Sequence, residues 1–212
     1  MNLEIIKGIG HFKGSSENGV VTMGTFDGLH LGHQMILRKL MQSSERERLF
    51  PLAITFEPHP RVLVTPNAPP PLLTIWEEKV ELFSRYMKGH LLVLDFNREL
   101  MNLTAEDFIR DYLVTKIGLK RLIVGYDHAF GKNRSGTIND LMELSRKYDF
   151  SLEIVDPILV DGKPISSSRI RRAFMEGKFA EGSAMLGHPY SVYGTVVKGI
   201  GLGRKLGYPT AN

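Results

Sequence analysis

The sequence of 212 residues contains no cysteine, and this absence excludes disulfide bonds and cysteine-based metal sites. It also contains no apolar run approaching the ~20 residues that a membrane-spanning helix needs. Residues 1–4 carry neither the basic region nor the long apolar core that open a signal peptide. We therefore expect a soluble, cytoplasmic protein that does not interact with membranes.

An excess of either charge is also missing. The 27 Lys and Arg residues against 23 Asp and Glu residues give a net charge of only +4, spread along the chain. Because nucleic-acid-binding proteins usually concentrate basic side chains on one face, this spread does not predict nucleic acid as a partner. It is compatible with an anionic small molecule. Nothing in the composition indicates an oligomeric state.

Apolar residues make up 42% of the chain, which is enough for the core of one medium-sized domain. Short apolar runs alternate with longer helix-like segments. The runs expected to form strands are residues 20–23, 52–56, 91–96, 122–124 and 152–155. The helix-like segments are residues 31–44, a stretch that Thr74 and Glu77 could cap, residues 104–118 and residues 137–148. This alternation predicts βαβ units, and hence a doubly wound, Rossmann-like α/β fold with a five-stranded parallel sheet.

The pattern changes after the fifth predicted strand. A serine cluster in residues 165–171 leads into a short helix, and residues 179–186 predict a second one. A Gly-His-Pro break follows, and residues 192–197 are rich in β-favouring side chains. We therefore expect a small helical appendage, followed by a domain boundary near residues 186–189.

The most informative stretch is residues 24–33, Gly-Thr-Phe-Asp-Gly-Leu-His-Leu-Gly-His. It lies between a predicted strand and a predicted helix, an arrangement that α/β proteins use to hold phosphate, and Gly28 and Gly32 allow close approach. His30 and His33 share one face of the first helical turn, where backbone N–H groups favour negative charge. Imidazoles there can donate hydrogen bonds to phosphate oxygens and stabilise phosphoryl or nucleotidyl transfer. The same spacing suits a metal site or two structural histidines, so spacing alone leaves three interpretations open.

The serine cluster within residues 165–171 has two interpretations. The hydroxyl groups of Ser166 and Ser167, the N–H groups of a helix start and the guanidinium of Arg171 all suit anionic oxygens. Serines before a helix also serve as simple N-caps, so both interpretations stay open. Asp127 is a third candidate, because it follows a predicted strand, where the ligands of doubly wound folds gather. It could equally cap a turn.

His-x-Gly-His after Gly-x-Phe-Asp-Gly resembles the nucleotidylyltransferase superfamily. Four further stretches match a narrower group, namely residues 55–60 (Thr-Phe-Glu-Pro-His-Pro), 125–131, 165–171, and 194–199 running into 203–212. The last of these resembles the start of a flavokinase domain. In this order the five motifs resemble the bacterial bifunctional riboflavin kinase/FAD synthetase family, and the likeness covers nearly the whole chain.

The resemblance implies an enzyme that adenylylates FMN with ATP and Mg²⁺, giving FAD and pyrophosphate. The FMN phosphate would attack the ATP α-phosphorus directly, so catalysis would come from alignment and charge neutralisation rather than from a protein nucleophile. His30 and His33 would bind the ATP phosphates. The loop around them would be shaped by Gly24, Phe26 and Gly28.

The remaining site residues follow from the same resemblance. The residues of a second phosphate clamp would be Ser166, Ser167 and Arg171. Those that contact flavin or nucleotide would be Phe56, Pro58 and Asp127. Phe56 and Pro58, as apolar residues at a strand end, suit the core equally well. His128 stands where the family usually has an aromatic residue.

The resemblance also divides the chain. Residues 1–186 would form the FMN adenylyltransferase domain, and residues 187–212 would be the N-terminal fragment of a riboflavin kinase domain, the first part of a β-barrel. Thr210 and Asn212 match the family element that serves Mg²⁺ and ATP in the kinase site. Because the chain stops at Asn212, we expect that site to be incomplete here, and the parent protein to phosphorylate riboflavin to FMN as well.

Other functions remain open. One is a flavin- or nucleotide-binding module without turnover. Another is a nucleotidylyltransferase with a different phosphorylated acceptor, although the later motifs are of the flavin type. Metal-dependent hydrolysis at His30 and His33 is disfavoured, because no acidic third ligand stands at a recognisable local spacing.

Overall fold

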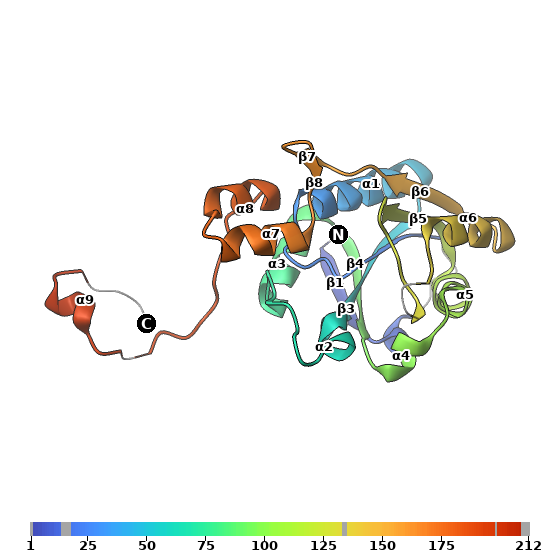
Figure 1. Ribbon diagram of the computed structural model, residues 1–212. Helices are drawn as coiled ribbons and strands as arrows, with labels where there is room; N and C mark the ends of the chain where they lie inside the picture. Colours follow the sequence, from blue (N-terminus) through green and yellow to red (C-terminus); the bar gives the residue numbers. More distant parts are fainter. Residues whose placement is uncertain (1, 14–17, 133–134, 198, 209–212) are drawn as a thin grey trace.

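The computed structural model describes residues 2–13, 18–132, 135–197 and 199–208. Its centre is a six-stranded parallel sheet with the strand order β1-β4-β3-β2-β5-β6 (Figure 1). The strands are β1 (Leu3–Lys7), β2 (Gly19–Met23), β3 (Phe50–Glu57), β4 (Gly89–Asp95), β5 (Leu119–Gly125) and β6 (Ser151–Val155). The predicted doubly wound α/β fold is confirmed, and each of the predicted strands is present.

The sheet has one strand more than predicted, because β1 extends its edge. β1 pairs with β4, so that Leu3 lies opposite Gly89 and Lys7 opposite Val93. Only Leu3 and Ile6 of β1 are partly buried, and the other residues are exposed. A short edge strand of this kind has a weak apolar pattern, and it forms because its neighbour supplies hydrogen-bonding partners.

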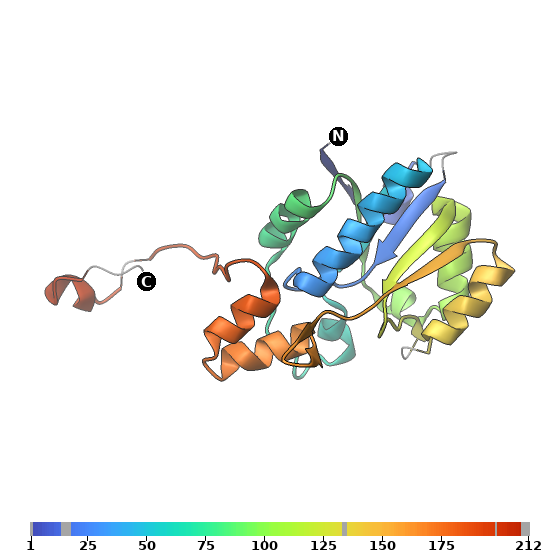
Figure 2. The same cartoon turned by 90° about the horizontal axis from the view of Figure 1, so that it is seen from above.

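Helices cover both faces of the sheet (Figure 2). The longer ones are α1 (Leu31–Glu47), α3 (Trp76–Tyr86), a π-helical segment (Phe108–Ile117) that continues α5 (Ala105–Asp107), and α6 (Ile138–Lys147). The connections contain η1 (Ile9–His11), α2 (Pro60–Val64) and α4 (Arg98–Asn102). Successive strand residues point to opposite faces, so Val20 packs with α1 and α3, whereas Val21 packs with the π-helical segment and α6. Both faces are therefore apolar, as a covered parallel sheet requires.

Of the two predicted helix caps, one is present in the structure and the other is not. The Thr104 hydroxyl accepts a hydrogen bond from the Asp107 N–H at 3.0 Å and so begins α5 as predicted. The predicted cap by Thr74 is wrong. The Glu78 carboxylate caps α3 instead, by accepting from the Ile75 N–H at 3.1 Å. Thr74 is used elsewhere, because its hydroxyl and N–H bind the loop that follows β2.

The predicted helical appendage is present. It contains α7 (Ser167–Met175) and α8 (Phe179–Leu186), preceded by an antiparallel hairpin of β7 (Leu159–Val160) and β8 (Lys163–Pro164) that the sequence pattern does not predict. A separate apolar cluster stabilises it, formed by Leu73, Ile165, Ile170, Ala173, Met185 and Leu186. Because Leu73 belongs to the connection before α3, this cluster ties the appendage to the α/β domain.

The chain beyond α8 leads away from the sheet (Figure 1). Residues 192–197, predicted to be β-rich, form no strand, and the described residues after α8 contain one short helix, α9 (Leu202–Lys205). A β-rich segment becomes a strand only where a second strand accepts its hydrogen bonds. The expected β-barrel fragment therefore shows no strand in residues 187–197 and 199–208. Thr210 and Asn212 lie outside the described residues, and the boundary near residues 186–189 stays a prediction.

Searching the described ranges, we find no helix that is both long and apolar enough to cross a membrane.

Candidate active site

Most of the candidate residues gather at the carboxyl edge of the sheet. The strand order reverses there, because β2 leads to β3 and β4 on one side whereas β5 leads to β6 on the other. Ligands of open α/β sheets bind at such a switch point. The loop after β2, residues 24–30, and the loop after β5, residues 126–131, both begin at this place.

Backbone strain is concentrated in the loop after β2. Phe26 and Leu29 have φ angles of 49° and 34°, in the left-handed region that residues with side chains rarely adopt. Gly28 has a φ angle of 79°, and a Cβ atom there would lie 2.8 Å from Leu73 Cδ1, so only glycine fits. Gly24 is under no such constraint, since an added Cβ would meet the Phe26 ring at an ordinary 3.5 Å. Phe26 and Leu29 are fully buried, and their packing holds the strained loop in one conformation.

His30 and His33 lie at the N-terminus of α1, as predicted. Their rings stack with centroids 3.6 Å apart, and Phe26 meets His33 edge-on at 5.2 Å. A Cβ atom on Gly32 would lie 3.2 Å from the His30 ring, so this glycine gives the ring room. Among the residues that the structure describes, no side chain caps α1, and its first turn holds no acid. The positive end of the helix dipole is therefore available to an anion.

Burial keeps both imidazoles neutral at neutral pH. It lowers the pKa of His30 from 6.5 to about 4, against the opposing charge of Asp27. Burial also lowers the pKa of His33 well below its ordinary value, with smaller effects of the same sign from His30 and Lys79. The Nδ1 atom of each ring is enclosed, although His33 as a residue is partly exposed, and in the described ranges neither atom has a hydrogen-bond partner. Because an unpartnered buried polar atom is costly, the pair is suited to receive a polar ligand.

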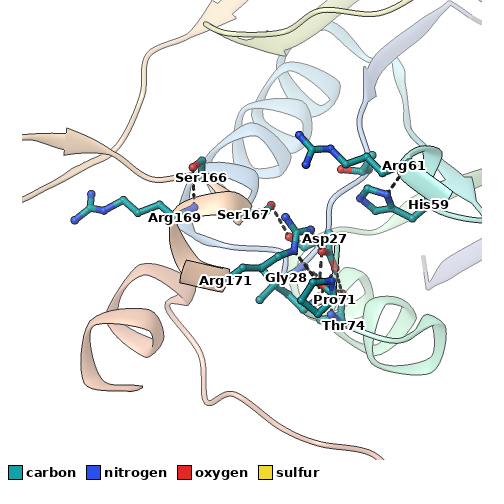
Figure 3. Close-up of polar contacts among 12 residues, drawn as sticks. Asp27, Gly28, His59, Arg61, Pro71, Thr74, Ser166, Ser167, Arg169 and Arg171 are labelled. Carbon is teal, nitrogen blue, oxygen red and sulfur yellow. Dashed lines mark hydrogen bonds and ion pairs between the residues drawn. The ribbon is translucent and has the colours of Figure 1, made fainter. Parts of the chain in front are cut away.

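Asp27 ties the same loop to two distant segments (Figure 3). The residue is 1% exposed, and its carboxylate accepts hydrogen bonds from the N–H groups of Leu73 and Thr74 at 3.0 and 3.1 Å. The Thr74 hydroxyl lies 3.3 Å from Asp27 Oδ1 and accepts from the Gly28 N–H at 3.1 Å. Arg171 on α7 completes the set through a buried ion pair with Asp27. A buried carboxylate needs such partners, so the loop conformation depends on both the connection before α3 and on α7.

The predicted clamp residues reach this loop, but their side chains have partners within the protein (Figure 3). Besides its ion pair, Arg171 donates from Nε to the Pro71 carbonyl oxygen at 2.7 Å. Ser167 donates to the Asp27 carbonyl oxygen at 2.9 Å. Ser166 caps α7 by accepting the N–H three residues later at 3.2 Å. Capping is therefore the observed use of the Ser166 side chain, and the clamp role of all three residues stays a prediction.

A surface cavity of about 550 Å³ opens beside this junction. Its charged and polar lining consists of Arg61, Ser168, Arg171, Arg172 and Glu176, and its other walls are Pro70, Pro71 and Met175. Three guanidinium groups against one carboxylate give the cavity a positive character. Such a cavity suits an anionic ligand.

The predicted flavin contacts follow β3 and β5. Phe56 is partly buried at the end of β3 and meets Phe96 edge-on at 5.8 Å, against the core on the face of the π-helical segment. Pro58 is partly buried directly after β3, and Asp127 is exposed after β5. Phe56 thus contributes to the core, as one of its two interpretations expects.

Several residues at this edge are not among the site residues that the sequence predicts. They are Asp27, His59, Thr74, Lys79 and His188. His59 is 7% exposed, and its Nδ1 accepts from the Arg61 N–H at 3.1 Å. His188 Nε2 lies 2.9 Å from the Gly28 carbonyl oxygen. Lys79 leaves a signal in the sequence, because it interrupts an otherwise apolar helix face.

Comparisons with known proteins identify relatives that cover almost all of this chain. The sequence profile of FAD synthetase matches residues 12–169, and that of riboflavin kinase matches residues 186–212. A bifunctional riboflavin kinase/FMN adenylyltransferase of Buchnera aphidicola subsp. Acyrthosiphon pisum is 37% identical over 210 residues, 99% of this chain and 67% of that protein. The protein of the same name from Escherichia coli K12 is 34% identical over 211 residues, with the same shares covered. A solved structure named macrolide-efflux protein, from Streptococcus pneumoniae, has a TM-score of 0.85 at 30% identity and covers 100% of this chain and 68% of its own.

Proposed function

Because the chain belongs to the FAD synthetase family, we propose that the carboxyl edge of its sheet binds ATP and FMN and joins them. The AMP moiety of ATP is transferred to the FMN phosphate, and the products are FAD and pyrophosphate. The resemblance that the five motifs predict is confirmed by the FAD synthetase match over residues 12–169. The chain is accordingly a nucleotidyltransferase.

One observation carries the proposed role of the loop after β2. His30 and His33 stack at an uncapped helix N-terminus, and each has an enclosed Nδ1 without a partner in the described part of the chain. An arriving triphosphate would supply that partner, and its charge would favour the protonated imidazoles. A metal site, the rival interpretation of the same pair, has no support in the geometry. The described residues contain no group of three His, Cys, Asp or Glu side chains that could hold an ion.

The reaction needs alignment rather than a protein nucleophile. An oxygen of the FMN phosphate attacks the α-phosphorus of ATP, and a new P–O bond forms. The bond from this phosphorus to the oxygen bridging the β-phosphorus breaks, and pyrophosphate leaves with the electron pair. If the FMN phosphate reacts as a dianion, no proton has to move. The site must therefore hold two anions with their reacting atoms in line and neutralise the charge that develops on the leaving group.

His30, His33 and the first N–H groups of α1 supply the hydrogen bonds to the ATP phosphates in this proposal. These bonds strengthen as negative charge grows on the departing pyrophosphate, which is the condition for lowering the barrier. Gly28 and Phe26 keep the loop in its strained shape, with Gly24 at its start. Asp27 does not react, and its contacts hold the loop against α7.

The second phosphate clamp remains part of the proposal in a modified form. Arg171 uses Nε and one terminal nitrogen within the protein, which leaves its other terminal nitrogen for a phosphate oxygen. Arg61 and Arg172 line the same cavity and extend its positive surface. Ser166 and Ser167 contribute by ordering the start of α7. Their hydroxyl groups would have to exchange partners to bind phosphate directly.

The remaining assignments rest on position. Phe56 and Pro58 stay candidates for the isoalloxazine ring, and Asp127 for the flavin or the nucleotide. Mg²⁺ is proposed as the ion that ATP carries, because the buried carboxylate of Asp27 is already occupied by Arg171 and by backbone donors. These residues fit a magnesium ion held mainly by phosphate oxygens and water. Riboflavin phosphorylation by the parent protein, the absence of nucleic-acid partners and the cytoplasmic location stay predictions.

A direct assay tests the proposal. The purified chain is incubated with FMN, Mg²⁺ and ATP labelled at the α-phosphate. Labelled FAD and unlabelled pyrophosphate are then both measured. We expect both products in equal amounts, and no product when riboflavin replaces FMN. A folded sample that makes no FAD contradicts the proposal.

Two outcomes would favour other functions. Tight FAD binding without pyrophosphate release would indicate a binding module. Turnover with pantetheine phosphate but not with FMN would indicate a different acceptor. We do not extend the efflux activity in the name of the S. pneumoniae protein to this chain, because the FAD synthetase profile covers the residues that build the histidine site.

A further inference from the structure

Helix α3 carries a buried lysine that has no hydrogen-bond or salt-bridge partner among the described residues. Lys79 is only 4% exposed and lies on the same helix face as Leu82 and Phe83, which are 6% and 0% exposed. Lysine is almost never buried without a paired acid. In the described residues, however, its ammonium group forms no hydrogen bond and no salt bridge. An unpaired buried charge of this kind calls for an explanation.

The position of α3 directs this charge to the histidine site. One turn after Lys79, the ring of Phe83 meets Phe26 at 5.2 Å, and Phe26 in turn meets His33 at 5.2 Å. Just before α3, Thr74 binds Asp27. Lys79 therefore lies between two contacts that α3 and its connection make with the loop after β2. Helical side chains lean toward the N-terminus of their helix, which directs this one toward the end of α3 that holds the loop.

The charges around Lys79 agree with this position. Burial lowers the pKa of Lys79, and the negative charges of Asp27 and Glu57 act in the opposite direction. Asp27 is already paired with Arg171. The positive charge of Lys79 in turn helps to lower the pKa values of His33 and His59. The Lys79 nitrogen is not among the fully enclosed polar atoms, so the little surface of this residue includes its charged end.

We propose that the Lys79 ammonium group binds the triphosphate of ATP beside His33 and stabilises the pyrophosphate as it leaves. The step is the one given above: the FMN oxygen bonds to the α-phosphorus, the bond to the bridging oxygen breaks, and the electron pair goes to pyrophosphate. Lys79 accepts no proton and gives none. It supplies a fixed positive charge, as a lysine point charge does in other phosphate sites. This inference rests on the proposed adenylyl transfer.

The position favours the triphosphate over FMN as the ligand. Lys79 belongs to the face of the sheet covered by α1 and α3, together with Phe26 and the histidine pair. Phe56, the candidate flavin contact, packs on the opposite face with the π-helical segment. Arg171, the alternative cation, already holds Asp27 and the Pro71 carbonyl. Lys79, whose charge acts on His33, forms no hydrogen bond or salt bridge with any other described residue.

Lys79→Met tests the role, because methionine keeps much of the apolar stem and removes the charge. We expect kcat/KM for ATP to fall about 100-fold or more, as for loss of one transition-state donor, while KM for FMN changes less than about threefold. The melting temperature should stay constant or rise, since a buried unpaired charge is lost. Lys79→Arg should keep part of the activity. Lys88→Met, at an exposed lysine just after α3, is the control and should behave as wild type.

Pyrophosphate binding, measured by calorimetry without FMN or turnover, separates this inference from the proposed function. Lys79→Met should weaken it about tenfold or more. If the wild-type chain makes no FAD but Lys79→Met still weakens pyrophosphate binding, the transfer reaction is contradicted and the role of the lysine stands. Unchanged pyrophosphate affinity, or equal losses for ATP and FMN that follow a lower melting temperature, would overturn the lysine role. Lys79→Gln is measured in parallel, so that poor folding of one variant does not remove the test.

Discussion

The carboxylate of Asp27, in the loop after β2, forms a buried ion pair with the guanidinium of Arg171 on α7, 144 positions later in the chain. The two side chains are 2% and 10% exposed. Each also binds backbone groups of the connection before α3: Asp27 accepts from Leu73 and Thr74, and Arg171 donates to Pro71. This pair therefore joins three segments around the histidine loop, and the shape of the site depends on it.

Loss of the arginine should destabilise the protein and not only slow the reaction. Arg171→Met leaves a buried carboxylate without its cation, which typically costs about 3–5 kcal/mol in the free energy of unfolding. Urea denaturation measures this change. Arg172→Met removes the neighbouring, exposed arginine of the same cavity and should cost less than about 0.5 kcal/mol. Equal stability of the two variants would mean that the Asp27–Arg171 pair does not hold the loop.

The histidine pair should matter for turnover far more than for folding. His33→Ala removes one hydrogen-bonding ring from the phosphate site, and we expect kcat to fall about 100- to 1,000-fold. The melting temperature should change little, because the ring has an unpartnered nitrogen. His11→Ala, at an exposed histidine, is the matched control. If the activity of His33→Ala falls only as far as its folded fraction does, the ring is structural.

Acid should unfold the protein partly through His30. Below pH 6.5 the unfolded chain binds a proton at this residue, whereas the folded chain accepts it only near pH 4. The free energy of unfolding should therefore fall as the pH drops from 6.5 to 4, by about 3 kcal/mol for this residue alone. His33 and His59, whose pKa values are also lowered, act in the same direction.

Stability curves at several pH values check this prediction. His30→Gln cannot take up the proton, so its loss of stability between pH 6.5 and 4 should be smaller than that of the wild type. Parallel curves for the two proteins would show that His30 titrates normally in the folded state.

Gly28 should tolerate no side chain. Its φ angle of 79° strains any other residue, and an added Cβ would lie 2.8 Å from Leu73 Cδ1. Gly162 has a similar φ of 69° with open space around it, so it serves as the control. We expect Gly162→Ala to cost about 1 kcal/mol of unfolding free energy, from backbone strain alone. Gly28→Ala should cost at least about 3 kcal/mol and should also reduce activity, since strain and clash add there.

Thermal unfolding of both variants provides the comparison. The difference between them isolates the contact with Leu73 from the backbone strain that they share. Similar costs would show that Leu73 moves aside and that the loop is more adaptable than its packing suggests.

The sequence predicts what depends on neighbours along the chain. The apolar runs of β2 to β6 are long enough to show buried strands, and the Thr104 cap requires only residues within one turn. The position of His30 and His33 on one face of α1 follows from helical spacing. Edge strand β1 is missed because its apolar signal is weak, and residues 192–197 fail as a strand because no partner lies beside them in the described chain.

The partners of the site residues are decided by tertiary structure. In sequence, Thr74 is as good a helix cap as Thr104. In the structure it is a hydrogen-bond partner of Asp27 instead, because the connection after β3 brings it beside the loop after β2. Ser166 has two interpretations in sequence, and the start of α7 uses its hydroxyl as a cap. Spacing along the chain carries no information on contacts between segments that are far apart in sequence.

The sequence by itself therefore determines the fold class, the phosphate-type loop of residues 24–33 and the family, because strand and helix periodicity and short motifs are local properties. Only the tertiary structure decides that Asp27 is held by Arg171, that the two imidazoles are buried and neutral, and that buried Lys79 forms no salt bridge within the described part of the chain. Those features depend on burial and on electrostatic fields, which sum over every segment that surrounds a group.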